Sequence, residues 1–340
     1  KGLILYNTEQ YEKAKEVLEA VALQYKRYAV AQQAVRTLRE IAVDQGTVNS
    51  FSQWVRVQGL TTFTDVELEK TAFTAAEKRF LDGDTNTAQK LLTEYLENYP
   101  KGTYYISATY YLAEVLFEKQ EFDQAILAYK ELTQGAVSNY SEKALIRLIG
   151  LLKNKSEWVA AIPYLEKLDT IASFEENKRF AVFNLMQGYY LEGSFPKTLK
   201  ITDRVLNIPN LESSIHWDAL TLKAKSALAL KDTITAAATY KQLETAPQSE
   251  VAAEAIYFRA HQLYQQGMFE ESNVLIDKIA QLGGSTGIWN VKALLLLAKN
   301  YFKLQDVFQA VFVLESIIEN FDRYPELIKE SKSLLELYKD

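Results

Sequence analysis

Apolar residues recur along this chain of 340 residues with the period of an α-helix, in pairs of neighbouring segments. Residues 294–318 show the pattern most clearly, because apolar positions spaced three or four apart fill one face of each half. The positions are Leu294, Leu297, Ala298 and Tyr301, then Val307, Ala310, Leu314 and Ile317. The spacing predicts two antiparallel helices joined by a short turn at 303–306. Ala298 and Ala310 would face each other at the crossing, where small side chains let the two backbones approach closely.

A small residue at the position of Ala310 recurs along the chain. The members are Ala14, Ala88, Ala125, Ala161, Thr198, Ala236, Ser272 and Ala310. Successive spacings are 74, 37, 36, 37, 38, 36 and 38, and 74 is twice 37. The missing member falls at Phe51, whose bulky ring predicts a hairpin that is splayed or packed differently. The sequence therefore predicts nine helical hairpins, the second of them divergent.

Two further positions follow the same register. Twelve residues before the second small residue, the first helix carries its own small residue in six hairpins: Gly2, Ala76, Ala113, Ala224, Ala260 and Ala298. Ile149, Met186 and Arg39 occupy that position in the other three. Three residues before the second small residue lies an apolar residue that we expect to close the base of the hairpin. It is aromatic in Tyr11, Phe122, Trp158, Phe195 and Phe269.

This register divides the chain into three regions. Residues 1–57 hold two N-terminal hairpins, of which the first is truncated and the second divergent. Residues 65–321 form a continuous array of seven hairpins, and residues 325–340 form a capping helix. The segments 58–64 and 281–287 are predicted loops, and the second contains the run Gly-Gly-Ser-Thr-Gly, which we interpret as a connector.

Composition supports an all-α fold and excludes several classes of function. Only 6 prolines and 13 glycines occur, and helix-forming residues fill most positions. The net charge is −6 and the basic residues are scattered, so nucleic acid is not an expected partner. No apolar run approaches the ~18 residues needed to cross a bilayer, so we expect no membrane insertion. The absence of cysteine excludes disulfides and thiolate metal sites.

Hairpins repeated at this interval, with small residues where the two helices cross and an aromatic residue at the base, resemble tetratricopeptide repeats. Pro100 also stands where that family places a closing proline, although the usual tryptophan of the first helix is absent. The resemblance implies an α-solenoid of about nine hairpins forming a right-handed superhelix, with a protein-binding concave surface lined by the first helices. The phrase ENYPKG and the tyrosine-rich first helices are similar to periplasmic tetratricopeptide domains of Gram-negative envelopes, such as the Tol–Pal coordinator. That similarity implies a location in the cell envelope as part of a longer protein whose export signal lies upstream.

Catalytic chemistry has little support in the sequence. The two histidines, His216 and His261, are more than one repeat apart and have no cysteine to pair with. We therefore expect no catalytic residues, no metal site and no cofactor.

One row of residues stands out as a candidate binding surface. In a tetratricopeptide superhelix, the residues three before and four after the first small residue point into the groove. Here they are Phe73 and Phe80, Tyr110 and Phe117, Phe183 and Tyr190, Tyr257 and Tyr264, then Leu295 and Phe302. Aromatic rings give large contact areas at low entropic cost, so this row is a candidate site for a protein or peptide. The alternative is that the rings pack on neighbouring first helices, and both interpretations remain open.

The expected function is a non-enzymatic scaffold or adaptor that binds protein or peptide partners on its concave surface. Two alternatives remain: a structural module that self-associates, and a cytoplasmic adaptor of the same family. An enzyme built on such a scaffold is a third, because a fold alone does not exclude an activity.

Overall fold

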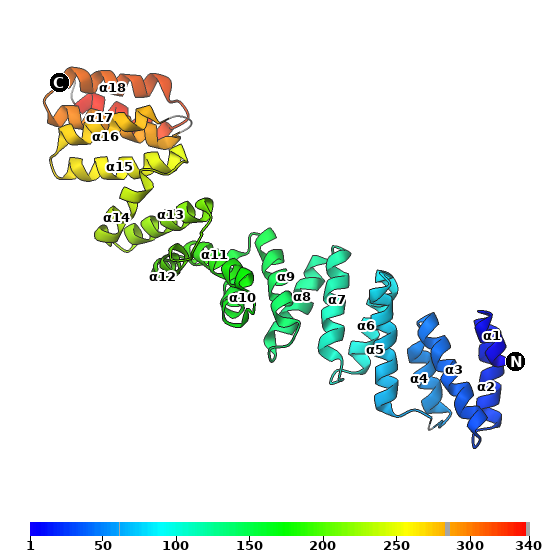
Figure 1. Cartoon of the computed structure of the whole chain (residues 1–340). Helices are drawn as coiled ribbons and strands as arrows, with labels where there is room; N and C mark the ends of the chain where they lie inside the picture. Colours follow the sequence, from blue (N-terminus) through cyan, green and yellow to red (C-terminus); the bar gives the residue numbers. More distant parts are fainter. Residues whose placement is uncertain (61, 283–285, 338–340) are drawn as a thin grey trace. The chain divides into compact units, whose positions relative to one another are not determined.

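The computed structural model describes residues 1–60, 62–282 and 286–337. Within these residues the chain forms 19 α-helices and no strand (Figure 1). Its packing divides it into two compact units, Lys1–Asn177 (unit 1) and Lys178–Asp340 (unit 2). The predicted loops 58–64 and 281–287 include residues 61 and 283–285, which lie outside the described residues.

Unit 1 contains five hairpins. Their helices are α1 (Gly2–Asn7), α2 (Tyr11–Gln24), α3 (Ala29–Gln45), α4 (Val48–Val57), α5 (Asp65–Leu81), α6 (Thr85–Asn98), α7 (Tyr105–Glu118), α8 (Phe122–Gln134), α9 (Ser141–Asn154) and α10 (Trp158–Ile171). The odd-numbered helix is the first of each hairpin and the even-numbered helix is the second.

The same numbering continues through unit 2. Its helices are α11 (Glu175–Glu192), which begins just before the boundary, α12 (Phe195–Leu206), α13 (Ser213–Ala229), α14 (Thr233–Leu243), α15 (Ser249–Gln265), α16 (Phe269–Gln281), α17 (Ile288–Lys303), α18 (Val307–Asn320) and α19 (Pro325–Leu337). α19 packs against α17 and α18.

Inside each unit, most second helices pack on two first helices. In unit 1, α6 packs on α5 of its own hairpin and on α7 of the next, and α8 does the same with α7 and α9. In unit 2, α16 packs on α15 and α17 (Figure 1), and α18 packs on α17 and α19. No hairpin buries its apolar faces alone, so each depends on its neighbours. This arrangement confirms the predicted α-solenoid class.

All nine hairpins share one turn. The residue two before each second helix has a left-handed backbone, with φ between 58° and 80°. These residues are Glu9, Gly46, Gly83, Gln120, Ser156, Gly193, Lys231, Gly267 and Gln305. Two backbone hydrogen bonds close each turn, as where Gly83 N donates to Phe80 O (3.1 Å) and Asp84 N to Arg79 O (3.0 Å). This is the Schellman ending of an α-helix, and its spacing of 36–38 residues confirms the predicted register.

The small residues lie where the register places them. All eight second small residues are fully buried, at 0% exposure. A methyl group added at Gly2 would lie only 2.7 Å from Leu18, so the first helix of hairpin 1 approaches α2 closely. At the crossing of α15 and α16, Ser272 Oγ donates to the carbonyl of Ala260 at 2.8 Å.

The second hairpin differs, as Phe51 predicts. α4 packs less extensively on α3 than α6, α8 and α10 pack on their first helices. Phe51 is itself buried and contacts Trp54 and Phe63 with ring centroids 6.3 and 6.0 Å apart. The ring needs space that an alanine would not, and α4 is consequently displaced from the regular packing.

No helix among the described residues combines the length and apolarity needed to cross a membrane.

Candidate functional site

The predicted row of aromatic residues separates into two sets with different surroundings. The first set lies three residues before the first small residue: Phe73, Tyr110, Phe183 and Tyr257. The second lies four residues after it: Phe80, Phe117, Tyr190, Tyr264 and Phe302. Phe73 is buried, with 6% of its surface exposed, and the others are half-buried. Phe73 thus belongs to the core and presents no binding surface.

Three rings of the first set contact an aromatic residue near the start of the first helix of the next hairpin. Phe73 stacks on Tyr104 and Tyr110 stacks on Tyr140, each with ring centroids 4.5 Å apart. Tyr257 contacts Trp289 less closely, at 5.5 Å and an interplanar angle of 43°. Tyr104, Tyr140 and Trp289 all lie nine residues before a first small position. This position was not predicted from the sequence, although it follows the same register.

Rings of the second set mostly pack across their own turn. Phe117 contacts Phe122, Tyr190 contacts Phe195 and Tyr264 contacts Phe269, with centroids 5.6–6.0 Å apart. The partner in each case is the aromatic residue predicted to close the hairpin base. These contacts give the second set a structural role.

In unit 1, further side chains cover the remaining ring faces. Tyr111 stacks on Phe80 at 4.6 Å, and its hydroxyl donates to Glu77 at 3.1 Å. The Arg147 guanidinium lies 4.4 Å from the centre of the Phe117 ring and pairs with Glu114 at 3.3 Å. The aromatic rings of α5 and α7 are therefore largely packed against each other and against charged side chains.

In unit 2, the rings around Tyr257 border open space. Two adjoining cavities of about 360 and 260 Å³ are lined by residues of α13, α14, α15, α17 and α19. Both are lined by Tyr257, His261 and Lys292, so they form one continuous depression, which we call the Tyr257 groove. The remaining lining residues are Lys225, Leu228, Tyr240, Glu254, Phe258 and Trp289 in the first cavity, and Tyr264, Leu295, Leu296, Lys299, Leu327 and Glu330 in the second.

The charges of the Tyr257 groove are mostly paired. Lys225 forms a salt bridge with Glu254 at 3.2 Å, and Lys299 forms one with Glu330 at 2.7 Å. The hydroxyl of the buried Tyr240 also donates to Glu254, at 3.0 Å. Lys292 forms no salt bridge within the described part of the chain. Its ammonium group lies 4.3 Å from the centre of the Trp289 ring.

His261 lies in the middle of the groove, between two tyrosines of its own helix. Its ring centroid is 6.0 Å from that of Tyr257 and 6.2 Å from that of Tyr264. Burial and the positive charge of Lys299 lower the pKa of His261 below its ordinary value. Burial raises the pKa of Tyr257, and the carboxylate of Glu330 raises it further. The free protein therefore favours neutral rings on the floor of the groove.

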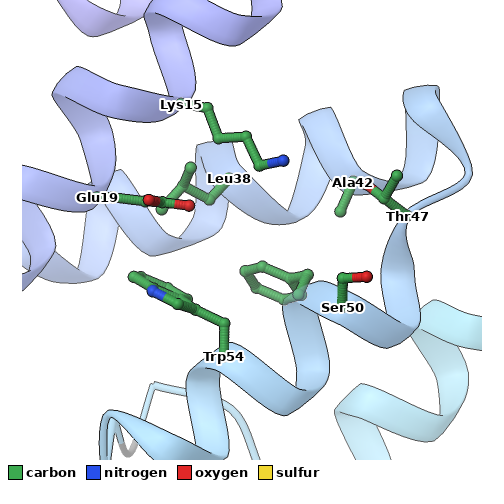
Figure 2. Close-up of a pocket in the computed structure, with 8 residues that line it drawn as sticks. Lys15, Glu19, Leu38, Ala42, Thr47, Ser50 and Trp54 are labelled. Atoms are coloured by element: carbon green, nitrogen blue, oxygen red, sulfur yellow. The ribbon is translucent and has the colours of Figure 1, made fainter.

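Unit 1 has a different cavity, of about 220 Å³, beside the displaced helix α4. Figure 2 shows that the apolar side chains of Leu38, Ala42 and Trp54 and the charged side chains of Lys15 and Glu19 lie around it. The lining residues are Lys15 and Glu19 on α2, Leu38 and Ala42 on α3, and Thr47, Ser50, Phe51 and Trp54 at α4. The cavity follows from Phe51, because a regular second helix would lie closer to α3 and fill this space.

Neither histidine belongs to a metal site in the described residues. Among them, no group of three or more His, Cys, Asp or Glu side chains is arranged to hold an ion. His216 contacts Trp217 on α13 at 5.1 Å. Of the glycine-rich connector, residues 283–285 lie outside the described residues.

The fold and the shared turn define the class of this protein: it is a helical-hairpin repeat protein. Residues 292–323 match the family model of the tetratricopeptide repeat, so the resemblance predicted from the sequence is confirmed there. This match covers most of α17 and α18, the hairpin whose pattern is clearest in the sequence.

Solved structures with a similar fold include other proteins of this kind. A tetratricopeptide repeat protein from Parabacteroides merdae is 14% identical, with 78% of this chain and 98% of that chain covered and a TM-score of 0.36. The quorum sensor NprR from B. thuringiensis, in its apo form, is 13% identical. The match covers 88% of this chain and 90% of NprR, with a TM-score of 0.41. The tetratricopeptide domain of P58(IPK) is 14% identical. The match covers 99% of this chain and 96% of that domain, with a TM-score of 0.30. No curated protein sequence matches the chain.

Proposed function

We propose that this chain is a scaffold that binds a peptide segment of a partner protein in the Tyr257 groove. One observation carries the proposal: aromatic positions that are packed together in unit 1 line an open depression in unit 2. The groove combines apolar rings with a few charged groups at its edges, which is the composition of peptide-binding surfaces. Its walls come from α13, α14, α15, α17 and α19, so repeat packing holds them in place.

A selection experiment tests this proposal. A displayed library of random dodecapeptides would be selected on the whole chain and, in parallel, on the Tyr257→Ala/Trp289→Ala double variant. We expect peptides enriched on the native chain to lose most of their affinity for the variant. The matched control is Tyr110→Ala in unit 1, which alters the same register position and should leave these peptides bound.

Either of two results would overturn the proposal. One is a selection that enriches no peptide, and the other is a set of peptides that bind the double variant as well as the native chain. Circular dichroism and hydrogen exchange of the variants establish that unit 2 remains folded.

A location in the cell envelope of a Gram-negative bacterium, within a longer protein, is part of this proposal. It is supported by the ENYPKG phrase and the tyrosine-rich first helices. The complete gene product fused to alkaline phosphatase, which is active only after export, tests it. An inactive fusion with normal expression would contradict the envelope location.

Self-association is a second candidate function, and one surface favours it. Phe308 and Phe312 lie one turn apart on α18 and are 78% and 63% exposed. Light scattering over a hundredfold range of concentration would reveal an oligomer, which Phe308→Ser/Phe312→Ser should abolish. A constant monomer mass would remove this candidate.

A further inference from the structure

We propose that the Tyr257 groove selects an acidic peptide segment carrying bulky apolar side chains, and binds it more tightly when His261 is protonated. This inference rests on the proposed function, because it names the ligand and the regulation of the same site.

The charge of the groove supports an acidic ligand. Three lysines and two glutamates line it, and both glutamates are already paired with lysines. Among the described residues, the partner of the Lys292 ammonium group is the Trp289 ring. The groove therefore has a surplus positive charge, although the chain as a whole carries a net charge of −6. A carboxylate would find an available ammonium group at Lys292, whereas a lysine or arginine would meet three cations.

The rings define the second feature of the ligand. Trp289 and Tyr257 form an apolar platform beside Lys292, and Leu228 lines the same cavity. The neighbouring cavity adds Leu295, Leu296 and Leu327. A segment in which glutamate or aspartate alternates with phenylalanine or leucine satisfies the ammonium group and the apolar surface together.

His261 makes the groove responsive to protons. The titratable and charged side chains that face the groove around it are Tyr257, Tyr264 and Glu254 on its own helix, Lys292 and Lys299 on α17, Glu330 on α19, Tyr240 on α14 and Lys225 on α13. In the free protein, burial and Lys299 disfavour the imidazolium form. A bound carboxylate adds negative charge beside the ring and stabilises that form.

The direction of the pH dependence follows by linkage. The ligand raises the pKa of His261, so the complex binds a proton that the free protein releases. Affinity therefore increases as the pH falls through the interval between the two pKa values. Glutamates of the ligand stay ionised above a pH of about 5, because their ordinary pKa is about 4.3.

A direct binding measurement tests the inference. The probe is fluorescein-labelled Gly-Ser-Glu-Phe-Glu-Leu-Glu-Phe-Gly, and its counterpart carries lysine in place of each glutamate. Fluorescence anisotropy would be recorded with the whole chain at pH 7.5 and pH 5.5. We expect the acidic probe to bind about threefold to tenfold more tightly at pH 5.5, the factor given by a pKa shift of about half to one unit. The basic counterpart should bind about tenfold more weakly than the acidic probe at both pH values, since Lys292 repels it.

Three variants separate the contributions. His261→Gln should bind the probe with nearly equal affinity at both pH values, because glutamine does not titrate. His216→Gln is the matched control, since His216 is the only other histidine and does not line the groove, so it should keep the full pH response. Lys292→Gln should weaken binding at both pH values and keep the response.

The inference is overturned if the basic probe binds as tightly as the acidic one, or if His261→Gln keeps the pH response. Nuclear magnetic resonance titration of the His261 imidazole in the native chain gives a second test that needs no variant. Its pKa should rise when the acidic probe is added, and an unchanged value would contradict the inference. If library peptides depend on Tyr257 but are not acidic, this inference fails while the proposed function stands. If no library peptide depends on Tyr257, the proposed function fails as well.

Discussion

The first helices of the two units carry aromatic residues at the same register positions but use them differently. In unit 1, Phe73 and Tyr110 are covered by the stacked rings of Tyr104 and Tyr140. In unit 2, Trp289 tilts away from Tyr257 and a cavity opens beside it. A shared repeat therefore supplies the positions, and the residue that introduces the next hairpin decides whether the rings form a core or a surface.

The largest expected effect distinguishes core from groove. Phe73→Ala should destabilise unit 1 by about 3–5 kcal/mol, because it removes a buried ring that contacts Tyr104 and Tyr95. Tyr257→Ala should destabilise unit 2 by only about 1–2 kcal/mol, because its ring is half-buried beside an open cavity. Hydrogen exchange followed by mass spectrometry reports the two units separately. Equal losses in the two variants would show that the rings have the same role.

The next prediction concerns two buried tyrosines whose hydroxyl groups each donate a hydrogen bond to a glutamate. Tyr129 donates to Glu114 at 2.5 Å in unit 1, and Tyr240 donates to Glu254 at 3.0 Å in unit 2. Tyr129→Phe and Tyr240→Phe should each destabilise their unit by about 1.5–3 kcal/mol, the usual range for a hydrogen bond to a charged group. Urea unfolding measures both, and a neutral result for either variant would show that the hydroxyl is dispensable there.

A smaller effect should be equal in the two units, because both use the same turn. A methyl group added at Gly83 or Gly267 meets no atom within 4 Å, yet both residues have a positive φ. Gly83→Ala and Gly267→Ala should therefore each destabilise by about 1 kcal/mol through backbone strain alone. Gln120→Gly and Lys231→Gly, at matching positions, are expected to be neutral or stabilising. Thermal unfolding checks all four, and a stable Gly83→Ala would show that the turn tolerates another backbone conformation.

The smallest effect concerns acid stability. Hydrogen bonds from Thr87 and Thr235 lower the pKa of the helix-capping residues Asp84 and Asp232. The folded-state pKa lies below the unfolded one, so this stabilisation is complete above about pH 4 and is lost as the pH falls further. Asp84→Asn and Asp232→Asn keep a capping side chain that does not titrate. Each variant should lose less stability than the native chain between pH 6 and pH 3 in urea unfolding, and an unchanged loss would contradict this role of the caps.

Much of the fold follows from the sequence because the same register recurs in hairpin after hairpin. The eight second small residues are all fully buried, and the anomaly at Phe51 marks the hairpin that packs differently. The role of the aromatic row on the first helices could not be predicted in the same way. Periodicity gives the helix face on which a residue lies, but not the side chains that pack over that residue. The burial of Phe73 depends on Tyr104, which lies 31 positions further along the chain.

The charged part of the groove could not be predicted in this way. Lys225, Lys292 and Lys299 lie on two helices and look like ordinary surface lysines in the sequence. Their proximity depends on how α13, α15 and α17 stack. Lys225 and Lys299 pair with Glu254 and Glu330, whereas Lys292 has no carboxylate partner in the part of the chain that the structure describes. The place of Trp289 in the groove could have been predicted from the sequence, since Trp289 shares its register position with Tyr104 and Tyr140.

The most direct test of this account is the affinity of the acidic probe for three forms of the chain at pH 5.5: native, Tyr257→Ala/Trp289→Ala and Tyr110→Ala. Fluorescence anisotropy should show native-like binding by Tyr110→Ala and a loss of about tenfold or more in the double variant, as expected for two ring contacts of about 0.5–1.5 kcal/mol each. Equal affinity in all three forms, or a greater loss in Tyr110→Ala, would contradict the assignment of the binding surface to unit 2.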